Sequence, residues 1–325
     1  MKKWIKENKL NLCIIFTWAI ISLIMIFFHE NWRDEAQSWL IVRDLSLGEI
    51  FSQLKYEGHF LFWYLIIMPF AKLGFPYITQ NIISWIIVLI SVLLINLKSP
   101  LKTYQKALFT FSLPMIYQFP VIARCYSLIP LAISLIAIFY KDRKEKTFRY
   151  ILSIVLLANT HTLILSMVGI LLLEFYIDCF KTWKTNSKSQ NKKYILSLVV
   201  VIILLFITAI PILSSLASNE TIGSNRNSNT EDVGFPLNIF AQIYNTIMTN
   251  YPVLYEITIF RVIILLSILV FFILAIKEYT KSSIEFLIIF LWQIFVYVFI
   301  FSLGVSYQKA RDTNYDINVF CLDKF

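Results

Sequence analysis

The chain has 325 residues, of which 58% are hydrophobic and only 15% are charged. An ordinary globular domain carries about 25% charged residues, so this composition excludes a water-soluble fold of this size, and lipid must surround most of the chain. The net charge of +9 would suit nucleic acid, but the basic residues lie in short clusters between apolar runs. That arrangement is typical of membrane loops and argues against a nucleic-acid partner.

Apolar runs of the length that spans a bilayer recur along the chain. A spanning helix needs about 20 such residues. The run over 150–180 is too long for one helix and is interrupted by Asn159-Thr160-His161, so we expect two helices there that meet at the outer face. The nine expected spans lie near 11–28, 77–96, 107–122, 125–140, 150–180 (two helices), 194–213, 259–276 and 284–303.

Lysine and arginine set the orientation of these spans, because cytoplasmic loops are enriched in both. Nineteen of the 29 basic residues fall in five clusters, at 2–9, 98–106, 141–149, 181–193 and 277–281. Nine spans place all five clusters and the N-terminus in the cytoplasm. The Ile-, Lys- and Asn-rich composition is typical of AT-rich bacteria, so we expect a multi-pass protein of a bacterial plasma membrane.

The segment His59–Leu73 is also apolar, but it does not fit as a tenth span. It is about 14 residues long, contains Pro69, and as a span would move the Lys98–Lys106 cluster to the outside. We therefore expect it to lie in the outer interface. The alternative is a short, tilted span with one cluster that breaks the charge rule.

The fold class predicted from these patterns is an all-α polytopic membrane protein with about nine transmembrane helices. We expect a single membrane domain over residues 1–325. It would include an outer loop with interfacial helices at 31–75 and a second outer loop at 214–258. The polar tail at 304–325 differs in composition from the rest and suggests a truncated or altered end.

Ionisable residues are nearly absent from the middle of the spans, which argues against an ion-coupled carrier. The densest polar stretch, Glu30-Asn31-Trp32-Arg33-Asp34-Glu35-Ala36-Gln37-Ser38-Trp39, directly follows the first span. Residues Asp34–Val42 fit one amphipathic helix, and Ser46–Gly48 separate it from a second. Two adjacent carboxylates near the headgroup plane suggest a catalytic pair. The plainer interpretation is two acids that suit the positive end of a helix dipole.

Three further groups are expected at the same depth. Glu57-Gly58-His59 brings a carboxylate and an imidazole to the start of the interfacial segment. Arg124, in Ala123-Arg124-Cys125-Tyr126, has no acid beside it in sequence and suits an anionic ligand. His161 follows a short helix. The plainer interpretations are an arginine that extends toward the headgroups and a histidine with a structural partner.

Four of these stretches resemble motifs of the GT-C glycosyltransferases, most closely the protein mannosyltransferase-like and aminoarabinose transferase-like branch. Trp-Arg-Asp-Glu-Ala-Gln-Ser-Trp at 32–39 resembles the acidic motif that follows the first span. Residues 57–64 resemble the family's Gly-His-Pro-Pro-Leu-Tyr-Tyr, 123–128 its Ala-Arg-Pro-Tyr-Ala-Leu, and 159–161 its Tyr-Thr-His. The matches keep the family's order, although Phe60, Leu61 and Cys125 stand where proline is usual.

The resemblance implies inverting transfer of a sugar from a polyprenyl-phosphate donor to a hydroxyl of a glycan, lipid or protein acceptor at the outer face. Asp34 would act as general base, and Glu35 would orient it. Arg124 and Tyr126 would bind the donor phosphate, which leaves as a stable anion and needs no second acid, unlike the leaving group of a glycosidase. A divalent metal is compatible with this site but not required. The other expected substrate contacts are Glu57, His59 and His161.

Two other functions fit parts of the pattern. A lipid-linked saccharide flippase, or another non-catalytic membrane protein of envelope glycan assembly, would need a hydrophilic path that the apolar spans do not suggest. A membrane-bound acyltransferase would need a reactive histidine–acid pair, for which Glu57-Gly58-His59 is the candidate.

Overall fold

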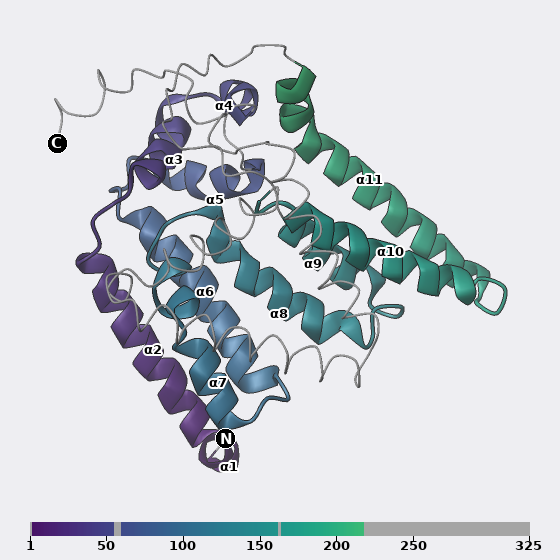
Figure 1. Ribbon diagram of the computed structural model, residues 1–325, viewed down its shortest axis with the longest axis horizontal. Helices are drawn as coiled ribbons and strands as arrows, with labels where there is room; N and C mark the ends of the chain where they lie inside the picture. Colours follow the sequence, from purple (N-terminus) through teal and green to yellow (C-terminus); the bar gives the residue numbers. More distant parts are fainter. Residues whose placement is uncertain (1, 55–59, 162–163, 218–325) are drawn as a thin grey trace, which may run out of the picture. The chain divides into compact units, whose positions relative to one another are not determined.

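The helices of the chain are drawn in Figure 1, and the computed structural model describes residues 2–54, 60–161 and 164–217. These residues belong to one unit, Met1–Ser218, and no strand occurs among them. The all-α prediction is therefore confirmed for the described ranges. The parts of the prediction that fall outside them are the spans near 259–276 and 284–303, nearly all of the loop at 214–258, and the tail at 304–325.

Three of the described helices are long and apolar enough to cross a membrane, judged by length and composition: α2, α6 and the first two-thirds of α11. The count of nine spans stays a prediction. In chain order the elements are α1 (Lys2–Glu7), α2 (Lys9–Phe27), α3 (Arg33–Asp44), α4 (Leu47–Gln53), α5 (Leu61–Lys72), α6 (Thr79–Lys98), α7 (Thr103–Thr110), the π-helical turn η2 (Pro114–Gln118), the 3₁₀ turn η3 (Cys125–Ser127), α8 (Leu128–Tyr140), α9 (Thr147–Ala158), α10 (Leu165–Lys181) and α11 (Lys188–Ala217).

Tryptophan side chains join α2, α6 and η2. The Trp18 ring stacks on Trp85 with centroids 6.3 Å apart, and its Nε1–H donates to the carbonyl of Met115 at 2.8 Å. Trp85 in turn donates to Ser22 Oγ at 2.9 Å. The indole N–H groups of Trp18 and Trp85 thus both find an acceptor, which keeps these two polar groups satisfied between apolar helices.

The expected helix near 107–122 is instead two short pieces, α7 and η2. Pro114 explains the break, because proline has no N–H to donate and its ring disfavours a continued α-helix. The break at Asn159-Thr160-His161, by contrast, is confirmed, since α9 ends at Ala158 and α10 begins at Leu165. α9 is short, at 12 residues, as the sequence indicated.

Helices α2, α6, α8 and α9 each have one end close to the polar residues around Glu35 and Arg124. α2 ends and α6 begins near Glu35, which binds both His29 and Asn81. α8 begins after Arg124, and α9 ends close to Tyr126 on the same side. The basic clusters at 98–106 and 141–149 fall at the opposite ends of these helices, and the cluster at 181–193 lies where α10 ends and α11 begins. The polar site and the basic clusters are therefore separated as expected, while the side that faces the cytoplasm stays a prediction.

The two helices predicted after the first span are confirmed as α3 and α4, but the interruption is shorter than the predicted Ser46–Gly48, because α4 already begins at Leu47. Ser46 ends the interruption between them: its Oγ accepts from the Glu49 N–H, and the Glu49 carboxylate accepts from the Ser46 N–H at 2.7 Å. This reciprocal pairing satisfies two backbone donors at the helix start. The capping residues are thus a local signal that fixes where α4 begins.

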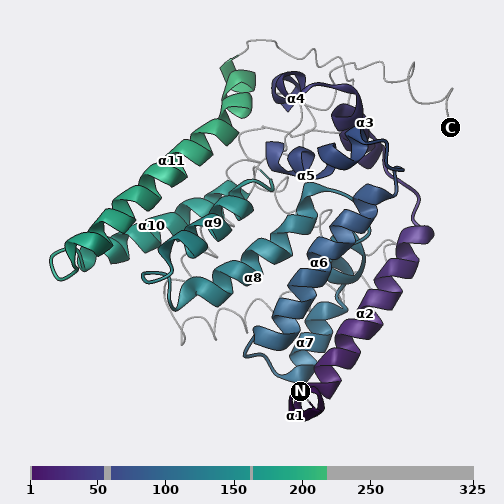
Figure 2. The ribbon, with the colours of Figure 1, turned by 180° about the vertical axis from the view of Figure 1, so that it is seen from behind.

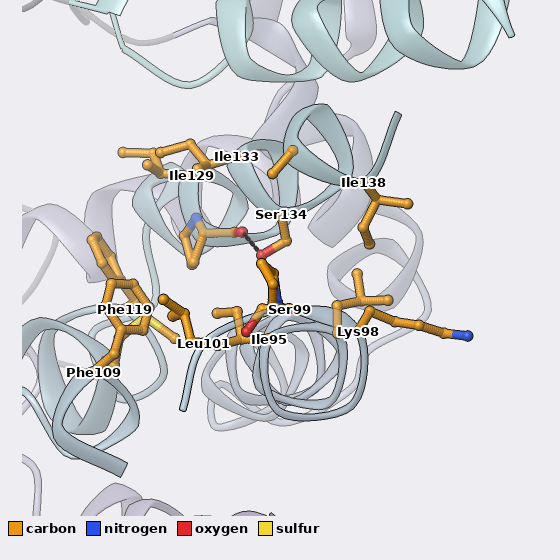
Figure 3. Close-up of a pocket in the computed structure, with 15 residues that line it drawn as sticks. Ile95, Lys98, Ser99, Leu101, Phe109, Phe119, Ile129, Ile133, Ser134 and Ile138 are labelled. Carbon is orange, nitrogen blue, oxygen red and sulfur yellow. Dashed lines mark hydrogen bonds between the residues drawn. The ribbon is translucent and has the colours of Figure 1, made fainter. Parts of the chain in front are cut away.

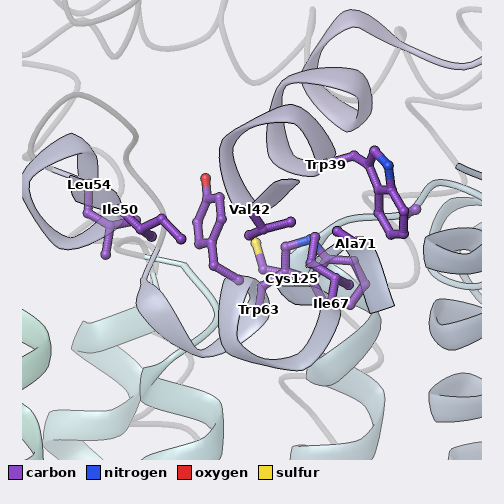
Figure 4. Packing of buried hydrophobic residues seen from close by; sticks show 10 residues of the cluster. Trp39, Val42, Ile50, Leu54, Trp63, Ile67, Ala71 and Cys125 are labelled. Carbon is purple, nitrogen blue, oxygen red and sulfur yellow. The ribbon is translucent and has the colours of Figure 1, made fainter. Parts of the chain in front are cut away.

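Helices α3, α4 and α5 lie together at the end from which α6 starts (Figures 1 and 2). α5 has 12 residues and so spans about 18 Å, shorter than the roughly 30 Å hydrocarbon core. Its length agrees with an interfacial helix, and that location stays a prediction. Figure 4 shows the apolar cluster that joins the three helices, with Trp39 and Val42 of α3, Ile50 of α4 and Leu54 directly after it, Trp63, Ile67 and Ala71 of α5, and Cys125.

Candidate functional site

Asp34 and Arg124 are brought together from distant parts of the chain. Nη1 of Arg124 lies 2.9 Å from Oδ2 of Asp34. Asp34 is in the first turn of α3, and Arg124 directly precedes η3. The Asp34 side chain is 28% exposed and that of Arg124 only 9%, so the acid reaches the surface while the guanidinium is nearly enclosed. The anionic partner that Arg124 lacked in sequence is thus the first of the two predicted carboxylates.

Glu35 faces the opposite way and is fully buried. Its Oε2 accepts from His29 Nε2 and from the Trp32 N–H, both at 2.8 Å. Its Oε1 accepts from the Ala123 N–H at 2.7 Å and from Asn81 Nδ2 at 3.2 Å. A buried carboxylate is costly unless donors surround it, and four donors meet that requirement here.

These bonds make Glu35 the link between three segments: the loop after α2, the start of α6 and the residues before η3. Asn81 Nδ2 also donates to the Val121 carbonyl at 2.9 Å, and Gln80 Nε2 donates to the Glu35 carbonyl at 3.3 Å. Because Ala123 directly precedes Arg124, the Glu35 carboxylate fixes the backbone that carries the guanidinium. The two adjacent acids therefore occupy different environments, with Asp34 toward the surface and Glu35 inside.

His29 was missed by the sequence reasoning. Its side chain is 1% exposed, and besides Glu35 it pairs through Nδ1 with the Tyr117 hydroxyl at 3.0 Å. Since a carboxylate only accepts, Nε2 must carry the proton that it shares with Glu35. The sequence signal was slight: a histidine at the end of the first span, six positions before its partner.

Tyr126 and His161 flank the arginine. The Tyr126 ring centroid lies 5.9 Å from Cζ of Arg124 and 5.7 Å from that of the His161 ring. Burial, and then the positive charge of Arg124, lower the pKa of His161 to about 4. His161 is therefore neutral near pH 7 and adds a polar but uncharged side chain beside Arg124 and Tyr126.

The structure thus gathers Asp34, Arg124, Tyr126 and His161 around one point, with Glu35 behind them. Glu57 and His59 lie outside the described residues, so their predicted substrate contacts stay predictions. Among the residues described, no group of three His, Cys, Asp or Glu side chains is placed to hold a metal ion.

This arrangement offers two chemical groups to a ligand. A partly exposed carboxylate can accept a proton from a hydroxyl, and a guanidinium can bind a phosphate through two parallel hydrogen bonds. A phosphate that binds Nη1 of Arg124 competes with Asp34 for that donor. Binding of an anion and release of the acid are therefore coupled by geometry.

No family model, curated protein or solved structure matches the chain. The resemblance of its motifs to the GT-C glycosyltransferases stays a prediction. Its function is inferred from the residues of the site and their geometry.

Proposed function

We propose that the protein is a membrane glycosyltransferase of the GT-C type, which transfers a sugar from a polyprenyl-phosphate donor to an acceptor hydroxyl at the outer face of the plasma membrane. The observation that carries the proposal is the 2.9 Å contact between Asp34 and Arg124. In this proposal Asp34 is the base and Arg124 binds the phosphate, and the contact supports it because the two side chains meet at the helix ends opposite the basic clusters. Folding has brought together two of the motifs on which the resemblance depends.

The class of donor follows from the proposed location at the outer face. Nucleotide sugars are cytoplasmic, so a site on the outer side needs a sugar carried by the membrane itself. A polyprenyl phosphate meets this need, because its chain lies in the bilayer and its phosphate lies at the interface. Arg124 is the described cation nearest to Asp34 and is held in place through Ala123 and Glu35.

The reaction is a single displacement. The donor phosphate takes hydrogen bonds from Arg124, which frees the Asp34 carboxylate for the acceptor hydroxyl. As the acceptor oxygen forms its bond to the anomeric carbon, Asp34 takes the hydroxyl proton. The bond between that carbon and the phosphate oxygen breaks, its electron pair leaves with the phosphate, and the configuration inverts. Arg124 stabilises the charge that develops on the leaving group.

The proposal is tested by mass spectrometry of surface glycans in a strain that lacks the gene and in the same strain carrying variants. We expect one sugar to disappear on deletion, to return with the wild-type gene, and to stay absent with Asp34→Asn. Glu30→Gln is the matched control, because Glu30 is an exposed carboxylate of the same loop. All proteins must reach the membrane at equal levels.

If Asp34→Asn restores the complete profile, Asp34 is not the general base. A flippase or a non-catalytic role in glycan assembly would then be the better explanation, because neither needs a proton acceptor at this position.

A further inference from the structure

A second site lies between α6, α7–η2 and α8, away from the Asp34–Arg124 pair. It is a groove of about 320 Å³, the lower end of the range for ligand sites. Twelve of its 15 lining residues are apolar, among them Ile95, Phe119, Ile133 and Ile138. We call it the α6–α8 groove; Figure 3 shows its lining.

The polar groups of the α6–α8 groove are few. Lys98 ends α6, and its side chain lies at one edge of the groove beside Ile138, with the amino group directed outward (Figure 3). Phe109 and Phe119 lie at the other edge. Among the described residues Ser99 Oγ is buried without a hydrogen-bond partner, whereas Ser134 Oγ donates to the Pro130 carbonyl at 2.7 Å.

The groove is therefore apolar along its length, with a cation and an unsatisfied hydroxyl from adjacent residues. A lysine at a helix end also suits the helix dipole, but that does not explain a buried hydroxyl without a partner. Lys98 belongs to the 98–106 cluster of basic residues, at the helix ends opposite Arg124. Basic pockets between membrane helices on such a side bind the headgroups of anionic lipids.

We propose that the α6–α8 groove binds one anionic phospholipid from the leaflet at the basic end of the helices. One acyl chain lies along α8 between Ile138 and Ile129, and the phosphate lies at the Lys98 ammonium and the Ser99 hydroxyl. This site is separate from the proposed transfer reaction and does not depend on it. The charge at the edge favours a lipid over a purely apolar partner such as another helix.

The test uses the full-length protein in lipid nanodiscs that contain a trace of phosphatidylglycerol with a photoreactive acyl chain. After irradiation, adducts are mapped by mass spectrometry. We expect adducts on the α6 and α8 residues that line the groove, and competition by unlabelled phosphatidylglycerol but not by phosphatidylcholine.

Two variants and two controls complete the design. Lys98→Gln removes one positive charge and should lower the adduct yield about fivefold, while Lys184→Gln, an exposed lysine outside the groove, should leave it unchanged. Ile133→Trp fills the groove at a residue that is 42% exposed and should abolish the adducts. Ile203→Trp, at an exposed position on α11, should not.

Equal labelling by a phosphatidylcholine probe, or no effect of Lys98→Gln, would overturn the assignment to an anionic lipid. The absence of lipid adducts on α6 and α8 would overturn the site itself. A photoreactive residue at position 133 would then report whether residues 219–325 or a second copy of the chain cover the groove instead.

Discussion

The Glu35 carboxylate is the part of the site whose removal should cost most stability. In Glu35→Gln the amide keeps the shape but has one acceptor oxygen, where the carboxylate has two oxygens that accept four hydrogen bonds. If the amide oxygen keeps the hydrogen bonds from the Ala123 N–H and Asn81 Nδ2, the new NH₂ group faces His29 Nε2 and the Trp32 N–H. His29 can adapt by moving its proton to Nδ1 and donating to Tyr117, so that Nε2 accepts from the amide.

The Trp32 N–H can only donate, so it cannot form a hydrogen bond with the new NH₂ group. One hydrogen bond to a charged group is then lost, and the other three become hydrogen bonds to a neutral amide. Together these changes should lower the free energy of unfolding by about 3 kcal/mol. For a chain of 325 residues, whose unfolding entropy is correspondingly large, that corresponds to a thermal midpoint lower by roughly 4 °C. Glu35→Ala leaves all four donors without this acceptor and should lower the midpoint further, or prevent folding.

Thermal unfolding of the purified protein in detergent, followed by tryptophan fluorescence, measures these shifts. Glu49→Gln is the control, because Glu49 caps α4 on the exposed surface and should change the midpoint little. A midpoint for Glu35→Gln equal to that of Glu49→Gln would refute the assignment of Glu35 as the link between α3, α6 and the Arg124 segment.

Three further results are expected. Arg124→Lys keeps the charge but loses the planar fork, so sugar transfer should fall 10- to 100-fold at unchanged protein level, and an unchanged rate would contradict phosphate binding there. Tyr117→Phe removes one hydrogen bond to His29 and should cost about 1 kcal/mol of unfolding free energy, measured by the same thermal assay. His161 has its folded-state pKa lowered to about 4 from an ordinary 6.5, so the unfolded chain binds the proton first and stability should fall as pH drops from about 6.5 to 4, by at most about 3 kcal/mol. In His161→Gln the stability should fall less over the same pH range. An equal fall in both proteins would contradict the assignment of His161 as a buried, neutral histidine.

Local features of the fold could be predicted from the sequence. The start of α4 is indicated by Ser46 and Glu49, three residues apart, because the side chain of each accepts a hydrogen bond from the backbone N–H of the other. The split at Asn159 follows from a run too long for one helix and a polar turn within it. Such signals act between near neighbours, so they do not depend on the rest of the fold.

The pairings of the site could not be predicted. Periodicity shows which face of a helix is polar but not which other helix it meets, so the sequence placed Asp34 and Arg124 at one depth without indicating that they pair. Gln80 and Asn81 belonged to an apolar run, and only the fold reveals that they hold the Glu35 segment.

Lys106, at the helix ends where the basic clusters lie, is another residue whose contact could not be predicted from the sequence. Sequence counting placed it in a basic loop cluster, yet it lies within α7 and is buried, with Nζ donating to the Asn96 carbonyl at 2.9 Å. A long side chain can reach a carbonyl of the neighbouring helix, and neither residue alone indicates this contact.

The most direct test of the central claim is the transfer rate of the purified protein, measured with the polyprenyl-phosphate sugar that the glycan comparison identifies. Wild type should give a product with inverted anomeric configuration, and Asp34→Asn should be slower by about 10²- to 10⁴-fold, the usual contribution of a general base. Equal rates for the two proteins, at equal stability, would contradict the account of Asp34 and Arg124 as the site of sugar transfer.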